Sequence, residues 1–422
     1  MKSRRYTISV ITLIALTIVA LSFALSALTY LLYPVGDIPD VDEVIADSAV
    51  SRLVELGYLT EYDIPEKDKN ASKYNVTIYE KGKAYDGLNA YCNRVDSILM
   101  FMDMEGTITE SIKLPLSECK LLEPYDDETA LVLSEDMGVT VIRKNQEPEV
   151  LITGGYHHDI GLDDKGLIYL VDYELENRSE ISDELLVLDN NFVVINMKGE
   201  IIKKVSLTDQ ILKDPILLQL TKNQKTYIRL PGYDGWDTYH TNTIEVIEKD
   251  VYKNGSMIFK KGDVLFCIRH INIIGVIDLN KEEIVWTYGP EGLEYPHKPT
   301  ITPEGNILIF DNGFERGYSS IKEIDPLTKK VVWEYKAENP EDFFSIDRGG
   351  VEILPNNNLL ITESRTGRVF EITEDGETVW EYYNTIVNDR ESGKRRMIYR
   401  MVRLHENQTG FLTPEPSEKA FS

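Results

Sequence analysis

Histidine is scarce in this chain of 422 residues, and three of its six histidines occupy similar places. His158, His240 and His297 each stand at the start of a predicted strand that opens a hairpin. A single histidine at a strand start is usually a hydrogen-bonding surface residue, but three in equivalent places indicate a shared cavity. A neutral imidazole is a competent nucleophile near neutral pH, so these residues are candidates for catalysis.

Two further residues add hydrogen-bond donors to the same predicted cavity. Arg269 ends the apolar segment VLFCI, where a charge is costly unless it faces a polar cavity or an anion. Asn242 lies two residues after His240, so strand alternation places both side chains on one face. Imidazoles, a guanidinium and an amide around one cavity suit a small tetrahedral oxyanion.

A repeat supplies the elements that must position these residues. Trp286, Trp333 and Trp380 are spaced 47 residues apart, and each closes a strand–turn–strand phrase such as IKEIDPLTKKVVWEYK. A fixed period of this length is typical of repeat architectures. A second hairpin lies upstream of two of these phrases, so each period holds four strands, the size of one propeller blade.

Weaker copies of the same pattern continue upstream, and six units fit within roughly 80–390. The spacing requires insertions at 208–233 and 249–261. The sequence therefore predicts an all-β, six-bladed β-propeller, with a seven-bladed ring and an open sandwich as alternatives. The first strand of each blade lines the central channel, so the three histidine positions should converge there.

The N-terminal segment predicts a membrane anchor. Residues 8–33 carry no charge, and a helix of this length exceeds the ~30 Å hydrocarbon core. Basic residues precede the segment and acidic residues follow it, so 1–7 should be cytoplasmic and the propeller extracellular or periplasmic. A cleaved signal peptide is the alternative. The remaining predicted segments are a membrane-proximal helical linker at 34–75, the propeller at 76–410 and a disordered tail at 411–422.

Composition limits the possible partners. The formal net charge of −26 argues against nucleic acid or an anionic lipid surface as a partner. Three cysteines make no disulfide framework, although Cys92 and Cys119 could pair across the first blade.

Four motifs together resemble those of bacterial and archaeal arylsulfate sulfotransferases. They are HHD at 157–159, WDTYHTNTIE at 236–245, IRHINIIGVID at 268–278 and PHKPTITPEGNILIFDNG at 296–313. The resemblance covers about 150–385 strongly and 80–150 loosely.

The resemblance implies a six-bladed propeller that moves a sulfuryl group from a phenolic (aryl) sulfate ester to a phenolic acceptor. It implies a ping-pong mechanism through a sulfohistidine, without a nucleotide sulfate donor, a metal or another cofactor. The nucleophile then falls on His297. The sulfate-binding and charge-stabilising roles fall on four other residues, His158, His240, Asn242 and Arg269. One departure is Lys298, because the family usually has an acidic residue after the nucleophilic histidine.

Two other functions remain open at this stage. A non-catalytic, membrane-anchored binding or scaffold propeller would keep the fold and lose the chemistry. A quinone-dependent dehydrogenase-like propeller would also contain Asp-turn-Trp phrases, which resemble the docking motif of that group.

Overall fold

The described part of the chain lies within one compact unit. A computed structural model describes residues 70, 72–224, 227–230, 233–386 and 395–412. The chain divides into the units Met1–Ile64 and Pro65–Ser422, and every described residue belongs to the second. The predicted segments 1–7 and 8–33, and most of the linker 34–75, lie outside the described residues. Among the residues that are described, no helix is both long and apolar enough to cross a membrane.

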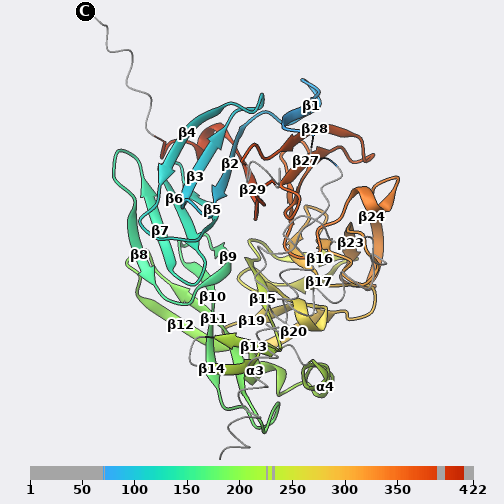
Figure 1. Cartoon of the computed structure of the whole chain (residues 1–422). Coiled ribbons are helices and arrows are strands. Elements are labelled where there is room, and N and C mark those ends of the chain that lie inside the picture. Colours follow the sequence, from blue (N-terminus) through green and yellow to red (C-terminus); the bar gives the residue numbers. More distant parts are fainter. Residues whose placement is uncertain (1–69, 71, 225–226, 231–232, 387–394, 413–422) are drawn as a thin grey trace, which may run out of the picture. The chain divides into compact units, whose positions relative to one another are not determined.

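Six antiparallel sheets form the blades of a propeller, which confirms the predicted fold (Figure 1). From inner to outer edge, the first three blades consist of β29 (Met401–Leu404), β2 (Leu88–Asn93), β3 (Ile98–Met102) and β4 (Ile108–Lys113); β5 (Cys119–Asp126), β6 (Thr129–Ser134), β7 (Gly138–Arg143) and β8 (Glu149–Thr153); and β9 (His157–Leu162), β10 (Ile168–Glu176), β11 (Leu186–Ile195) and β12 (Ile201–Ser206).

The last three blades follow the same order. They consist of β15 (Thr241–Val246), β18 (Val264–Ile268), β19 (Ile273–Asp278) and β20 (Glu283–Tyr288); β21 (His297–Ile301), β22 (Ile307–Asp311), β23 (Ser320–Asp325) and β24 (Lys330–Tyr335); and β25 (Gly350–Ile353), β26 (Leu359–Glu363), β27 (Arg368–Ile372) and β28 (Thr378–Tyr383), with β1 (Asn75–Tyr79) outside β28.

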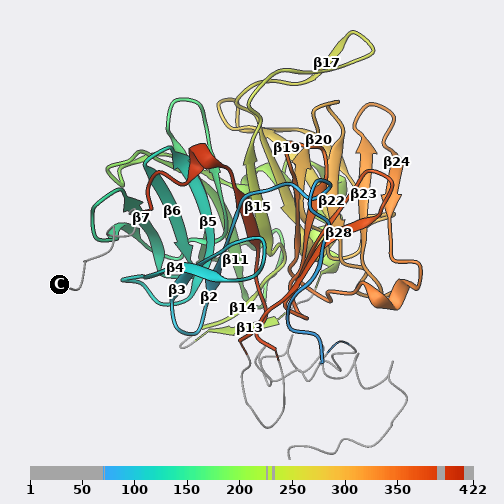
Figure 2. The ribbon, with the colours of Figure 1, turned by 90° about the horizontal axis from the view of Figure 1, so that it is seen from above.

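Both predicted insertions carry secondary structure of their own. Between the third and fourth blades lie α3 (Leu207–Ile211), α4 (Pro215–Asn223), β13 (Tyr227–Leu230) and β14 (Tyr233–Trp236). Inside the fourth blade, β16 (Val251–Lys253) and β17 (Ser256–Phe259) form a hairpin that projects from the blades (Figure 2). Three short 3-10 helices are η1 (Arg269–Ile271), η2 (Pro340–Asp342) and η3 (Glu406–Gln408).

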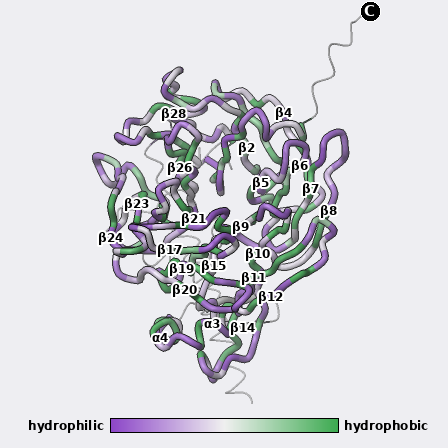
Figure 3. The backbone as a smooth tube through the Cα atoms, turned by 180° about the vertical axis from the view of Figure 1, so that it is seen from behind, coloured by the Kyte–Doolittle hydropathy of each residue, from purple (hydrophilic) through white to green (hydrophobic). Residues whose placement is uncertain are grey.

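The strand sequences explain the layering of each blade. Every residue of the middle strands β6, β18, β22 and β26 is buried, because these strands are covered on both faces by neighbouring blades. The outer strands β4 and β24 are partly exposed and carry alternating charged residues. Hydrophobic stretches accordingly recur in every blade (Figure 3).

The tryptophans of the 47-residue repeat join successive blades. Trp286 Nε1 donates a hydrogen bond to the Pro326 carbonyl at 2.9 Å, at the outer turn of the fifth blade. Trp380 Nε1 donates to the Met104 carbonyl at 2.9 Å, which connects the sixth blade to the first. This structural role accounts for the spacing of both tryptophans.

The two ends of the propeller unit close the ring. β29 is the innermost strand of the first blade and pairs with β2, whereas β1 pairs with β28 as an extra outer strand of the sixth blade. Closure therefore joins the first and sixth blades twice. The propeller begins at Asn75 rather than at residue 76. It also extends past 410, because Phe411 is buried against Phe101, so the predicted tail begins too early.

A disulfide and an ion pair strengthen this region. Cys92 on β2 and Cys119 at the start of β5 form a disulfide, which links the first blade to the second rather than crossing the first alone. Arg403 on β29 is fully buried, and its guanidinium contacts Glu371 Oε2 at 2.6 Å and Asn89 Oδ1 at 2.7 Å. Arg403 thus joins the closing strand to both neighbouring blades.

We expect Arg403→Met to lower the free energy of unfolding by about 3–5 kcal/mol, because Glu371 is left charged and buried without its cation. Urea unfolding curves measure the change. Lys81→Met is the matched control, because Lys81 and Glu105 form an exposed pair whose loss costs less than about 1 kcal/mol. The double change Arg403→Met with Glu371→Gln should recover part of the loss. Equal effects of Arg403→Met and Lys81→Met would contradict the closing role.

Candidate functional site

The candidate site lies where the innermost strands of three consecutive blades begin. His157 opens β9, His240 directly precedes β15, and His297 opens β21. The backbone is left-handed at His158 (φ 67°), His240 (φ 49°) and Lys298 (φ 44°), and each strand has a register shift at this point. Such strained bulges cluster at functional sites, where they redirect side chains.

A chain of hydrogen-bonded imidazoles forms one wall of the site. His158 Nε2 lies 3.1 Å from His240 Nε2, and His157 Nδ1 lies 2.6 Å from His158 Nδ1. The Asp237 carboxylate lies 2.7 Å from His240 Nδ1 and accepts its hydrogen. The proton of His240 is therefore on Nδ1, and its Nε2 accepts the hydrogen of His158 Nε2. Burial lowers the pKa of both His158 and His240, so both rings are neutral.

The surroundings of His297 fix its tautomer. The Asn312 amide nitrogen donates to two backbone carbonyls, those of Ser345 and Arg348, so its Oδ1 faces His297. His297 Nδ1 lies 2.7 Å from that oxygen and 3.0 Å from the Tyr295 carbonyl. With two acceptors around it, Nδ1 must carry the hydrogen, and Nε2 keeps its lone pair.

His297 is also held in its neutral form. Burial, followed by the charge of Arg269, lowers the pKa of His297 to about 3. Its Nε2 lies 3.2 Å from the backbone N–H of Arg348. The residue therefore presents an unprotonated, oriented nitrogen next to a hydrogen-bond donor, which is the arrangement required of a nucleophile.

Lys298 does not contact the imidazole that precedes it in the chain. Its ammonium lies 3.4 Å from Asp159 and 3.6 Å from Glu245, on the innermost strands of neighbouring blades. Asp159 also pairs with Arg400 at 2.8 Å. The lysine charge is thus neutralised within the channel. The orientation of His297 depends on Asn312 and not on the residue at position 298.

Arg269 follows β18 as the first residue of η1, next to the apolar strand as predicted. Its Nη2 lies 2.8 Å from His270 Nε2, and its guanidinium lies over the Tyr295 ring, 5.1 Å from the centroid. Within the described part of the chain, its buried Nε has no hydrogen-bond partner, so a donor remains for a ligand oxygen. Its charge lowers the pKa of both His240 and His297, which places the guanidinium between them electrostatically.

Asn242 has a different environment from the one that strand alternation predicts. The register shift between Thr241 and Thr243 interrupts the alternation after His240. The Asn242 side chain is buried and donates to the Pro296 carbonyl at 2.8 Å. In this structure Asn242 holds the residue before His297 in place.

Several site residues were not identified from the sequence. They are Asp237, His270, Asn312 and Arg348. Asp237 and His270 lie inside motifs that the sequence analysis singled out, so proximity to a predicted histidine was the available signal. Asn312 and Arg348 follow strand ends of later blades, and their role depends on the closed ring.

Three of these side chains could hold a metal ion. Donor atoms of Asp237, His240 and His270 lie within 4.8 Å of one another. His270 Nδ1, however, donates to the Asp237 carbonyl at 2.9 Å, while its Nε2 accepts from Arg269. Metal binding would require His270 to give up one of these hydrogen bonds.

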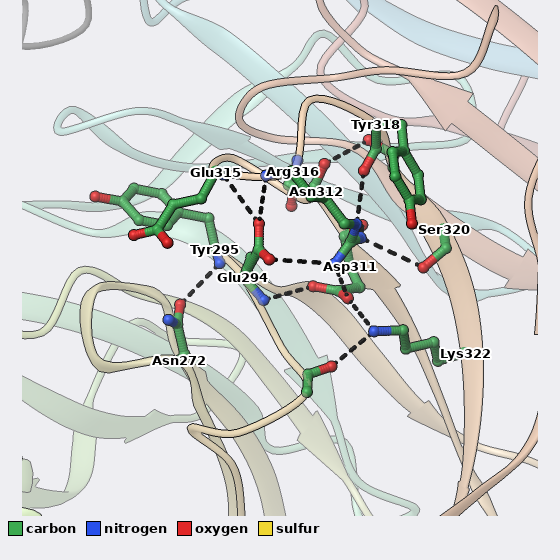
Figure 4. Close-up of polar contacts among 12 residues, drawn as sticks. Asn272, Glu294, Tyr295, Asp311, Asn312, Glu315, Arg316, Tyr318, Ser320 and Lys322 are labelled. Atoms are coloured by element: carbon green, nitrogen blue, oxygen red, sulfur yellow. Dashed lines mark hydrogen bonds and ion pairs between the residues drawn. The ribbon is translucent and has the colours of Figure 1, made fainter. Parts of the chain in front are cut away.

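A cleft of about 430 Å³ opens beside Tyr295, and some of its polar contacts are drawn in Figure 4. Its walls come from loops of the fourth and fifth blades. Lining residues are Asn272, Pro290, Gly292, Leu293, Glu294, Tyr295, Glu315, Arg316 and Lys322. A second cavity of about 760 Å³ lies elsewhere, near the ends of β29 and β2, and includes Tyr85, Leu88 and His405.

Solved structures share the fold at low sequence identity. A protein of unknown function from Bacteroides caccae is 13% identical with a TM-score of 0.48, covering 75% of this chain and 98% of its own. A virginiamycin B lyase from Staphylococcus aureus is 14% identical with a TM-score of 0.42, covering 74% and 84%. At such low similarity these structures carry no argument about activity. No curated protein matches the chain.

The family comparison is more informative. The family model described as arylsulfotransferase (ASST) matches residues 134–385, which is more than half of the chain. The matched region contains all five residues predicted for the site, which are His158, His240, Asn242, Arg269 and His297. The chain belongs to the arylsulfotransferase family.

Proposed function

We propose that this protein is a sulfotransferase that moves a sulfuryl group from an aryl sulfate ester to a phenolic acceptor, without a nucleotide sulfate donor. The observation that carries the proposal is the environment of His297. Its imidazole is neutral, its tautomer is fixed by Asn312, and its Nε2 faces donors that can hold an oxyanion. The family membership supports the same type of reaction.

In the first half-reaction, His297 Nε2 attacks the sulfur of the aryl sulfate. The sulfur–oxygen bond to the aryl group breaks, and the aryl oxide leaves. Sulfuryl transfer resembles phosphoryl transfer, in which charge spreads over the equatorial oxygens of a loose transition state. The Arg269 guanidinium and the Arg348 backbone N–H are the donors proposed to stabilise that charge.

In the second half-reaction, the acceptor phenol attacks the sulfur of sulfohistidine, and the bond to His297 breaks. His240 takes the proton of the phenol, and the Asp237 carboxylate at Nδ1 stabilises the resulting imidazolium. That proton is then available to the aryl oxide that leaves in the next turnover. His158 orients His240 through the contact between their Nε2 atoms.

We also propose that residues 8–33 anchor the protein in the cell membrane, with 1–7 in the cytoplasm and the propeller outside. The charge asymmetry around this segment supports the orientation. The Cys92–Cys119 disulfide supports it as well, because disulfides persist mainly in oxidising compartments.

The nucleophile is tested by trapping the covalent intermediate. Purified protein incubated with an aryl sulfate and no acceptor should gain one sulfuryl mass on the peptide that contains His297, measured by mass spectrometry at neutral pH. His297→Ala should abolish this adduct. His405→Ala is the control, because His405 lies at the second cavity and outside the site. An adduct that persists in His297→Ala would refute the assignment.

The low pKa of His297 predicts a flat pH profile for adduct formation. Because its pKa lies near 3, the imidazole is neutral throughout the range from about pH 5 to 8, and the single-turnover rate should not fall on the acid side. Asn312→Asp places a carboxylate at Nδ1, which raises the pKa of His297 and should produce an acid-side decrease. Asn306→Asp, on the turn between β21 and β22, is the control. An identical profile in Asn312→Asp and wild type would argue against the Asn312 contact.

The proposed topology is tested with protease added to intact cells. The propeller should be digested or released, while a cytoplasmic marker protein stays intact. Full protection of the propeller under conditions that degrade a known surface protein would rule out the external location.

A further inference from the structure

The cleft beside Tyr295 is continuous with the proposed reaction centre through this one residue. The Tyr295 carbonyl lies 3.0 Å from His297 Nδ1, and its ring lies beneath the Arg269 guanidinium. The same ring stacks on Phe314, with centroids 4.5 Å apart and an interplanar angle of 15°. Tyr295 also lines the cleft of about 430 Å³. An aryl group bonded to a sulfuryl at His297 therefore has an aromatic wall and an adjoining space.

The frame of the cleft is preformed. Tyr295 has a left-handed backbone (φ 53°), which is unusual for a bulky residue and costs about 1–3 kcal/mol. The neighbouring side chains hold this conformation: Asn272 Oδ1 accepts from Tyr295 N at 2.8 Å, and Asp311 Oδ1 accepts from Glu294 N at 2.7 Å. Figure 4 shows this network around the loop. Ligand sites are usually formed in advance in this way.

The charges along the cleft are unevenly satisfied. Arg316 and Lys322 both donate to the buried Asp311, at 2.7 and 2.5 Å. Glu294 accepts hydrogen bonds from the backbone N–H groups of Glu315 and Arg316. Among the described residues, the exposed Glu315 carboxylate has no ion pair, so it is the lining charge left for a ligand.

We propose that this cleft binds the ring substituent of the phenolic substrate and that Glu315 selects substituents carrying an ammonium group over those carrying a carboxylate. The inference rests on the proposed sulfotransferase function and names the substrate class more narrowly. Tyr295 provides the wall for the ring, and Glu315 lies at the cleft into which the substituent extends. Attraction of the cationic group and repulsion of the anionic group then act in the same direction.

Three acceptors of similar shape test the proposal. They are 4-(2-aminoethyl)phenol, 4-ethylphenol and 4-hydroxyphenylacetate, each assayed with one aryl sulfate donor at low salt. Wild type should show a kcat/KM for the amine about tenfold above that for the acid, with the ethyl compound between them. Glu315→Gln should bring the amine and the acid close together, and Glu315→Lys should reverse their order. Added salt should reduce the preference of wild type.

Glu304→Lys is the matched control, because Glu304 is also exposed but lies on the turn between β21 and β22, away from the lining of the cleft. It should leave the ratio at the wild-type value. An equal ratio in Glu315→Lys and Glu304→Lys, with the sulfohistidine still forming, would overturn the subsite alone. If wild type forms no sulfohistidine with any aryl sulfate, the proposed function fails and the subsite fails with it.

Discussion

Closure of the ring is the constraint on which the rest of the structure depends. The innermost strand of the first blade comes from the C-terminal side of the propeller, and an outer strand of the sixth comes from the N-terminal side. Arg403 and Glu371 form a buried ion pair across this joint. Because a closed ring brings the starts of all innermost strands to one axis, residues from separate blades can build one site.

The interior of the site combines costly features that the surrounding blades must stabilise. Several imidazoles are buried without a positive charge, and the backbone is left-handed at His158, His240 and Lys298. Each feature is unfavourable by itself, and such strain persists only where the surrounding packing determines it. The fully buried middle strands supply that packing. The strain sets the direction of the side chains before any substrate binds, which is the condition for electrostatic stabilisation of a transition state.

The electrostatics of the channel separate two groups of charges. Near the histidines, Arg269 provides a cation with an unused donor, although the whole chain has a formal net charge of −26. Along the innermost strands, Lys298 and Arg400 are neutralised by Asp159 and Glu245. The positive charge available to an oxyanion is therefore concentrated beside His297. Lys298, which departs from the family pattern, belongs to the neutralised group.

The sequence by itself determined the number of blades and the histidines of the site. The 47-residue period reflects one hairpin pair per blade, and Trp286 and Trp380 repeat because each must reach the next blade. Local pattern also identified His297 and Arg269, since a polar residue at the end of an apolar strand is informative without knowledge of its neighbours.

Only the tertiary structure decided how the ring closes and how the nucleophile is oriented. The pairing of β2 with β29 joins residues about 300 positions apart, and β29 carries no phrase of the repeat. Asn312 acquires its role because Ser345 and Arg348, from the loop before the next blade, fix its amide. The bulge at Asn242 breaks the alternation that a regular strand would have. These features depend on contacts between blades, and residue spacing within one blade contains no information about them.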